Sequence, residues 1–288
     1  MLRFLHRSCL TLALVGCAKP VALPPPVSLE PGRTGVSELA RVPPLDDRAY
    51  RIVELDNGLT AIVVSDPDAT ESAAALAVGV GSFAEPDDRP GLAHFLEHML
   101  FMGTELYPNV DGFSDHLAAH AGDSNAWTDD ELTLYHFTID PGGFDEALHR
   151  FSRFFIDPLL NKRYVNKERK SVESEYRMNI EERGQRWLEA IRETVHPDHP
   201  GSRFSWGSLE TLADRPDDRV MDDLRVFYDA YYTANRMHLA LVGSEPLDTL
   251  EGWVRGRFAE VPAGPGAALP GPQAHFQDDQ LGVQIDIQ

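Results

Sequence analysis

The segment Gly91-Leu-Ala-His-Phe-Leu-Glu-His-Met-Leu-Phe-Met-Gly103 carries His94, Glu97 and His98 in an H-x-x-E-H pattern. Pro90 suits a first helical turn, no proline interrupts the segment, and its final glycine offers a stop, so it predicts a helix. On a helix His94 and His98 share one face, about 6 Å apart along the axis. Two neutral imidazoles at that separation can bind one zinc ion. Glu97 lies near the same face, where it can act on a metal-bound water.

A catalytic zinc site usually takes three protein ligands and leaves the fourth position to water, so a third ligand is needed. The best candidates lie on a second expected helix, in the segment from Glu168 to Met178. Glu168 and Glu175 are two helical turns apart and share a face, whereas Glu173 points elsewhere. The residue pattern alone therefore leaves Glu168 and Glu175 as candidates.

The motif and its surroundings resemble the family of zinc metallopeptidases that includes pitrilysin and insulin-degrading enzyme. H-x-x-E-H is the inverzincin signature, the reverse of the H-E-x-x-H of thermolysin-like enzymes. Residues 91–104 look like that family beyond the motif itself. In the family the third ligand is a Glu about 76 residues beyond the second His, and here 76 residues lie between His98 and Glu175.

The resemblance implies one zinc ion per chain, held by His94, His98 and Glu175. It implies hydrolysis of peptide bonds by a zinc-bound water, with Glu97 taking the proton of that water and passing it to the leaving amine. Glu168 matches a further acidic position of the family, whose expected role is to orient a ligand histidine. The alternative for Glu168 is an exposed helix carboxylate without a role.

Two further stretches, residues 124–128 and 203–212, also look like family segments, and the resemblance covers roughly residues 45–265. By resemblance Asn125 and Ala126 contact the backbone of peptide substrates, which add a strand to the edge of the enzyme's sheet. The alternative is that Asn125 simply satisfies the hydrogen bonds of its own loop.

Other side chains favour structural roles. His116 and His120 form a second pair four residues apart, but they lack a motif Glu and a recognisable third ligand, so a second zinc site is disfavoured. Phe204 and Trp206 are interpreted as packing residues. There is no G-x-S-x-G elbow, and both cysteines lie in the first twenty residues, so a Ser or Cys nucleophile is excluded.

Composition sets broad limits on function. With 288 residues and 42% hydrophobic content, the chain can form a sizeable core in one or two domains. The formal net charge of −20 argues against nucleic-acid binding, which needs a basic surface. An acidic surface of this kind is typical of a soluble protein.

The N-terminus predicts export. Two arginines precede a short apolar run, Leu10 to Val15, which is too short to span a bilayer and predicts a signal peptide over residues 1–16. The residues that end at Cys17 resemble a bacterial lipobox, which implies lipidation of that cysteine; a plain cleaved signal peptide is the alternative. The proline-rich residues 17–45 predict an extended tether. We therefore expect a periplasmic lipoprotein that contacts the membrane only through its lipid anchor.

Residues 46–262 are expected to form the catalytic domain. Asn57-Gly58 between two apolar runs predicts a hairpin. Expected strands cover residues 50–55, 60–65, 72–80, 132–139 and 237–242. Expected helices cover residues 91–103, 111–121, 144–155, 162–195 (bent near Gly184), 217–232 and 247–258, and residues 122–130 are expected to be a polar loop. The predicted class is α+β, an antiparallel sheet packed with helices, as in one half-chamber domain of the pitrilysin type.

Residues 263–288 are expected to be a linker and the opening strand of a second, truncated domain. Pro262 to Pro272 is rich in Pro and Gly, and Leu281 to Ile287 alternates like a strand. The resemblance implies a second half that closes over the catalytic one. The expected partners are peptide substrates and such a half, with no nucleic acid. The alternative function is a zinc-binding but inactive half that acts only as a binding subunit with a partner domain.

Overall fold

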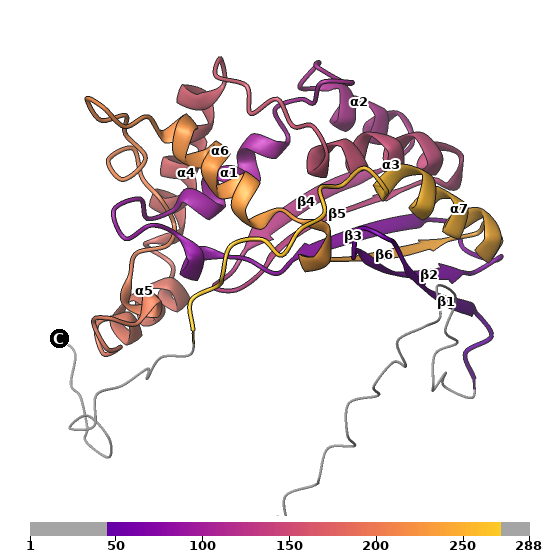
Figure 1. Cartoon of the computed structure of the whole chain (residues 1–288), viewed down its shortest axis with the longest axis horizontal. Coiled ribbons are helices and arrows are strands. Elements are labelled where there is room, and N and C mark those ends of the chain that lie inside the picture. The colour runs from indigo at the N-terminus through magenta and orange to yellow at the C-terminus, as the bar shows by residue number, and fades with distance from the viewer. Residues whose placement is uncertain (1–44, 272–288) are drawn as a thin grey trace, which may run out of the picture. The chain divides into compact units, whose positions relative to one another are not determined.

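The structure is a computed structural model that describes residues 45–271, and all structural statements refer to that part of the chain. Its centre is a six-stranded sheet (Figure 1). The strands are β1 (Ala49–Glu54), β2 (Thr60–Ser65), β3 (Ser72–Val78), β4 (Asp123–Thr128), β5 (Thr133–Ile139) and β6 (Met237–Gly243). The helices are α1 (Leu92–Leu100), α2 (Gly112–Ala119), α3 (Phe144–Ser152), α4 (Val165–Asn179), α5 (Arg183–Arg192), α6 (Val220–Tyr231) and α7 (Leu247–Phe258).

The strands lie in the order β1-β2-β6-β3-β5-β4, so the last strand in sequence sits in the middle of the sheet. β6 pairs parallel with β2 and antiparallel with β3, and the other pairs are antiparallel. The predicted α+β class is confirmed, and the sheet is antiparallel as expected except for the parallel pair β2–β6. A parallel pair needs a long crossover, and the whole of residues 66–236 connects β2 to β6.

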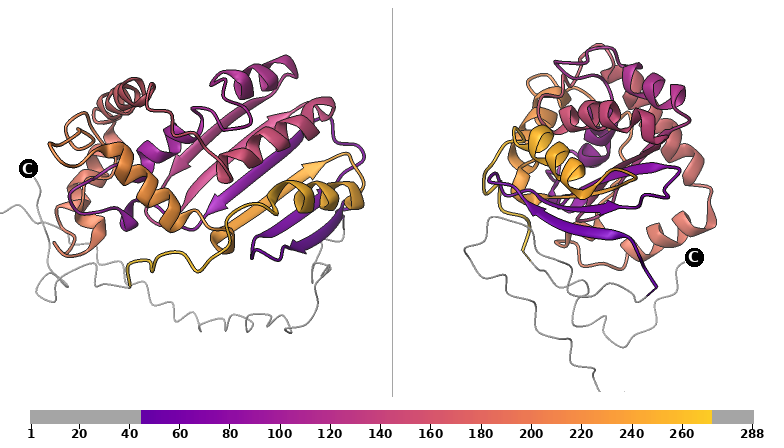
Figure 2. Two further views of the ribbon diagram at one scale, coloured as in Figure 1. Left: turned by 45° about the horizontal axis from the view of Figure 1, so that its top comes forward. Right: turned by 90° about the vertical axis from the view of Figure 1, so that its right-hand side faces the viewer.

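Helices α1, α2, α3 and α7 cover one face of the sheet (Figures 1 and 2). The strands under them alternate as this requires: every second residue of β3 and of β5 is buried. The core between the layers is rich in phenylalanine, and its rings meet mostly edge to face, a favourable arrangement for aromatic pairs. Phe101, which directly follows α1, joins this cluster through an edge-to-face contact with Phe154.

Strand β4 lies where the sequence predicted a polar loop over residues 122–130, so that prediction is wrong. Its side chains alternate between exposed and half-buried, with none fully buried. Ala126 packs against the core, whereas Trp127 is exposed. A strand without a fully buried face carries little hydrophobic alternation, which is why its sequence does not look like a strand. β4 pairs with β5 on one side and forms an edge of the sheet.

The long helical segment expected over residues 162–195 is two helices. α4 ends at Asn179 and α5 begins at Arg183, with Glu182 in an extended conformation between them. A bend near Gly184 was therefore expected in nearly the right place. No helix in the described residues is long and apolar enough to cross a membrane. The predicted signal peptide, Cys17, nearly all of the tether and the strand at 281–287 lie outside the described residues.

A buried carboxylate fixes the start of α1. The two carboxylate oxygens of Glu85 accept hydrogen bonds from the backbone N–H groups of Gly91 and Ala93, both at 2.8 Å. A helix leaves its first N–H groups without internal partners, and side-chain oxygen atoms that accept hydrogen bonds from them stabilise that end. Gly91 has φ +88, a conformation that glycine adopts most easily. Glu85 thus caps the helix that carries the H-x-x-E-H motif.

Replacing Glu85 by alanine should lower the free energy of unfolding by about 2 kcal/mol, because two N–H groups lose a buried partner. Glu85→Gln should cost less, since its amide oxygen still accepts one bond. Denaturant unfolding of the full chain measures both. Glu71→Ala, at an exposed position, is the control and should stay within about 0.5 kcal/mol of the parent. A Glu85→Ala protein as stable as the control would contradict the capping role.

The stability of the fold should also depend on pH through this residue. Burial raises the pKa of Glu85 from 4.5 to about 8, although its backbone hydrogen bonds act in the opposite direction. Because the folded pKa is the higher one, the stabilising contribution is complete below about pH 4.5 and is lost as the pH rises through about 8. Over this range the free energy of unfolding should therefore decline more steeply for the parent than for Glu85→Gln. Equal slopes for the two proteins would refute the assignment.

Candidate metal centre

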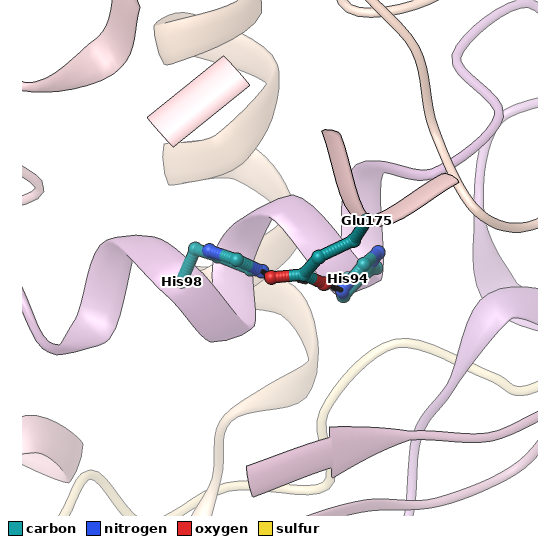
Figure 3. Close-up of side chains that lie close together, drawn as sticks. All are labelled: His94, His98 and Glu175. Carbon is teal, nitrogen blue, oxygen red and sulfur yellow. Dashed lines mark hydrogen bonds and ion pairs between the residues drawn. The ribbon is translucent and has the colours of Figure 1, made fainter. Parts of the chain in front are cut away.

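Two helices bring three ligand atoms to one point (Figure 3). His94 and His98 project from α1 and Glu175 from α4. The two Nε2 atoms are 3.3 Å apart, and the carboxylate oxygens of Glu175 lie 3.4 Å from Nε2 of His94 and 3.5 Å from Nε2 of His98. Among the described residues, this is the one group of three or more His, Cys, Asp or Glu side chains whose ligand atoms all lie within 4.8 Å.

The other nitrogen of each imidazole is held from behind. Nδ1–H of His94 donates to the backbone carbonyl of Trp206 at 2.7 Å, and Nδ1–H of His98 donates to Oε2 of Glu168 at 3.4 Å. In this tautomer both Nε2 lone pairs point at the place where the carboxylate of Glu175 also points. Electron-rich groups that face one another at this distance repel unless a proton or a metal cation lies between them.

The pKa values of the group reflect the same need for positive charge. Burial opposes the charge on His98, but hydrogen bonds to Glu168 and Glu175 outweigh it and raise the pKa of His98 to about 9. Hydrogen bonds from His94 and His98 lower the pKa of Glu175 to about 2. Two imidazole nitrogens and one carboxylate are a ligand set of catalytic zinc, so the residues present fit that ion.

Glu97 lies beside this group without belonging to it. Its side chain is buried, and Oε2 accepts a hydrogen bond of 2.6 Å from the hydroxyl of Thr128 at the end of β4. Burial raises the pKa of Glu97, while the neighbouring His94 and the bond from Thr128 lower it. The hydrogen bond occupies one carboxylate oxygen and leaves Oε1 available. The site thus contains a carboxylate able to exchange a proton next to the metal position.

Glu168 is buried against His98, so the alternative of an exposed helix carboxylate is excluded. The hydrogen bond with His98 also lowers the pKa of Glu168, which keeps this carboxylate ionised. Glu168 therefore lies where a residue that orients a ligand histidine is expected.

A cavity of about 680 Å³ lies over the centre. His94, Glu97, His98 and Glu175 line it, together with Asn125 and Ala126 of β4 and Gln185 and Arg192 of α5. β4 borders the cavity as an edge strand. An edge strand presents backbone N–H and C=O groups to any extended chain that lies beside it.

Two contacts of the site were not recognised from the sequence. Trp206 was interpreted as a packing residue, yet its backbone carbonyl accepts a hydrogen bond from His94. Because every residue has a backbone carbonyl, the residue type does not indicate this contact. Thr128 is the last residue of the segment 124–128, and the resemblance of that segment to the family is the one sequence signal that pointed to Thr128. The disfavoured second pair is not a metal group: Nε2–H of His116 donates to the carbonyl of Gly143, and Nδ1–H of His120 donates to that of His116.

The chain is similar to a family of peptidases. Residues 60–203 match the family described as insulinase (peptidase family M16), and residues 220–286 match the M16 inactive domain. The chain is 40% identical to the insulin-degrading enzyme of Drosophila melanogaster and 38% identical to protease 3 of Escherichia coli (strain K12), in each case over 84% of this chain and 25% of the relative. It therefore spans about a quarter of the length of these relatives.

The fold is similar to that of a solved structure as well. The crystal structure of pitrilysin matches 86% of this chain with a TM-score of 0.82 and 35% sequence identity, and the match covers 27% of the pitrilysin chain. The resemblance stated on the motif, the spaced Glu175 and the two further segments is thereby confirmed. The chain belongs to the insulinase family of peptidases, M16.

Proposed function

We propose that this protein is a zinc-dependent metalloendopeptidase that hydrolyses peptide bonds in peptides or small unfolded proteins. The observation that carries the proposal is the convergence of His94, His98 and Glu175 in one cavity with the buried Glu97 beside them. Membership of a peptidase family supports the reaction class.

Zinc, when bound, polarises a scissile carbonyl and makes water a better nucleophile. His94, His98 and Glu175 would hold the ion. Glu97 accepts the proton of the attacking water on the oxygen that Thr128 leaves free, and then delivers it to the leaving amine. The hydrogen bond from Thr128 keeps the carboxylate from rotating away during both steps.

The edge strand β4 is the proposed contact for the substrate backbone. Asn125 and Ala126 lie on the cavity wall. An extended peptide that pairs with β4 would pass along the cavity and present its backbone to the metal position. Recognition through backbone hydrogen bonds alone depends little on the sequence of the substrate.

A zinc-binding half without activity of its own is the second candidate function. The match covers about a quarter of each relative, so the activity of a whole relative need not belong to the matched part alone. In that case a second half-chamber domain or subunit would complete the chamber. Export and lipidation at Cys17 stay predictions from the sequence.

Replacing Glu97 by glutamine should lower kcat/KM by at least about 100-fold, because the amide cannot accept the proton. Zinc binding should be unchanged, since Glu97 is not among the three ligands. Cleavage of a quenched fluorescent peptide by the full chain and zinc content by atomic emission measure the two effects. Glu105→Gln, at an exposed position, is the control. If Glu97→Gln keeps its activity, the proposed base is wrong; if the parent binds zinc without cleaving, the second candidate is favoured.

Zinc should stabilise the folded protein through Glu175. A ligand that binds only the folded state adds about 2.7 kcal/mol at a concentration 100 times its Kd. Saturating zinc should thus raise the Tm of the parent by several degrees, and Glu175→Ala should lose most of that increase. Lys170→Ala, at an exposed position on the same helix and outside the group, should retain it. An equal zinc-dependent increase in Glu175→Ala would remove this residue from the ligand set.

A further inference from the structure

We propose that residues Arg203–Gly207 are a positioning segment that fixes the tautomer and the orientation of His94, and so prepares its Nε2 for the metal. Of the two ligand histidines, His94 alone is held by a main-chain group in the described part of the chain. The identity of the metal rests on the proposed function, whereas the contact to His94 does not.

The contact itself is the carbonyl of Trp206. It accepts the Nδ1–H of His94 at 2.7 Å, a closer approach than the 3.4 Å between His98 and Glu168. A carbonyl can only accept, so this bond requires the proton on Nδ1 and leaves the Nε2 lone pair free. A side chain can rotate out of such a contact, but a carbonyl moves only with its backbone. The position of this hydrogen bond therefore depends on how well the backbone of the segment is held in place.

Arg203 anchors the first end of the segment to the loop that precedes α1. Its guanidinium donates to the carbonyl of Phe83 at 2.9 Å, to the carbonyl of Glu85 at 3.0 Å and to the carboxylate of Asp87 at 2.6 Å. The side chain of Glu85 in turn caps α1. The segment and the motif helix are thus held by one loop. A lysine has no planar fork with which to reproduce these bonds.

Gly207 anchors the other end by direct backbone contact with the start of α1. A Cβ on Gly91 would lie 2.1 Å from the Cα of Gly207, a distance that no side chain tolerates. Gly207 itself has φ +85, and a Cβ there would lie 3.1 Å from side-chain atoms of Leu212 and Val172. Two glycines therefore let the chains touch, which places the preceding carbonyl within reach of His94 in the first turn of α1.

Leu209, two residues beyond Gly207, also ties the segment to α4, the helix that carries Glu175. The N–H of Leu209 donates to the carboxylate of Glu173 at 2.9 Å, and its carbonyl accepts from Arg169 at 2.7 Å. Both partners belong to α4, which carries Glu175. The segment is consequently held against both ligand-bearing helices, and it fixes His94 relative to each of them.

The test measures the tautomer of His94 in the metal-free full chain by two-bond ¹H–¹⁵N correlation after histidine-selective labelling. The parent should show the proton on Nδ1. Arg203→Ala and Gly207→Ala should show a mixture of tautomers and bind zinc about tenfold more weakly in competition with a chelator. The matched controls are Arg255→Ala, which removes an exposed ion pair on α7, and Gly256→Ala, where an added Cβ meets nothing within 4 Å. Both controls should behave like the parent.

Retention of the parent tautomer and zinc affinity in both segment variants would overturn the proposal. The proposal would also be overturned if Trp206→Ala lost the parent tautomer and zinc affinity while Gly207→Ala kept both. The indole, which lies edge-on at 6.0 Å from the His94 ring, would then be the group that holds His94. If Gly207→Ala does not fold, Arg203→Lys replaces it and should show a smaller loss than Arg203→Ala. A parent that binds no zinc but whose tautomer still depends on the segment would refute the proposed function and support the positioning role.

Discussion

The residues of the candidate metal centre bring electron-rich atoms together, and a proton or a metal cation must offset their repulsion. Two imidazole lone pairs and a carboxylate face one another within 3.3 to 3.5 Å, on helices that are far apart in sequence. Without a proton or a metal cation between its members, such a cluster is repulsive. Its members must be held there by other interactions, and the surrounding contacts are those interactions: a buried cap at Glu85, a carbonyl behind His94 and a carboxylate behind His98.

The elements that hold α1 differ from those that border the cavity. The apolar side chains of α1 belong to the core, while Glu85 of the preceding loop caps the start of this helix. Placing a catalytic group on a helix that is itself held by buried hydrogen bonds limits the motion of its ligands. The cavity side, by contrast, is bordered by an edge strand and by α5, which has no buried residue. The histidines of the ligand group therefore lie on a tightly held helix, and the cavity lies beside elements with few buried side chains.

The sequence predicted those parts of the fold and site in which residue type determines the outcome. His94, Glu97 and His98 follow from helical spacing, and the choice of Glu175 over Glu168 came from resemblance, since both lie on one helix face. Strand β4 could not be predicted, because neither of its faces is fully buried. The carbonyl of Trp206 could not be predicted either, because every residue has a carbonyl and only tertiary structure selects one. The parallel pairing of β2 with β6 arises because β6, the last strand in sequence, lies between β2 and β3. The local pattern of apolar residues in a strand does not determine its neighbours in the sheet.

The central place of β6 has a consequence for synthesis on the ribosome. Without this strand, β1–β2 and β3–β5–β4 are two separate sheets with facing open edges. All the residues of the metal centre, and the segment behind His94, leave the ribosome before residues 237–243 do. The nascent chain therefore carries a complete set of ligands on an incomplete scaffold, with unpaired strand edges that invite association with other chains. Insertion of one strand closes both edges at once and joins the two halves of the sheet beneath the site.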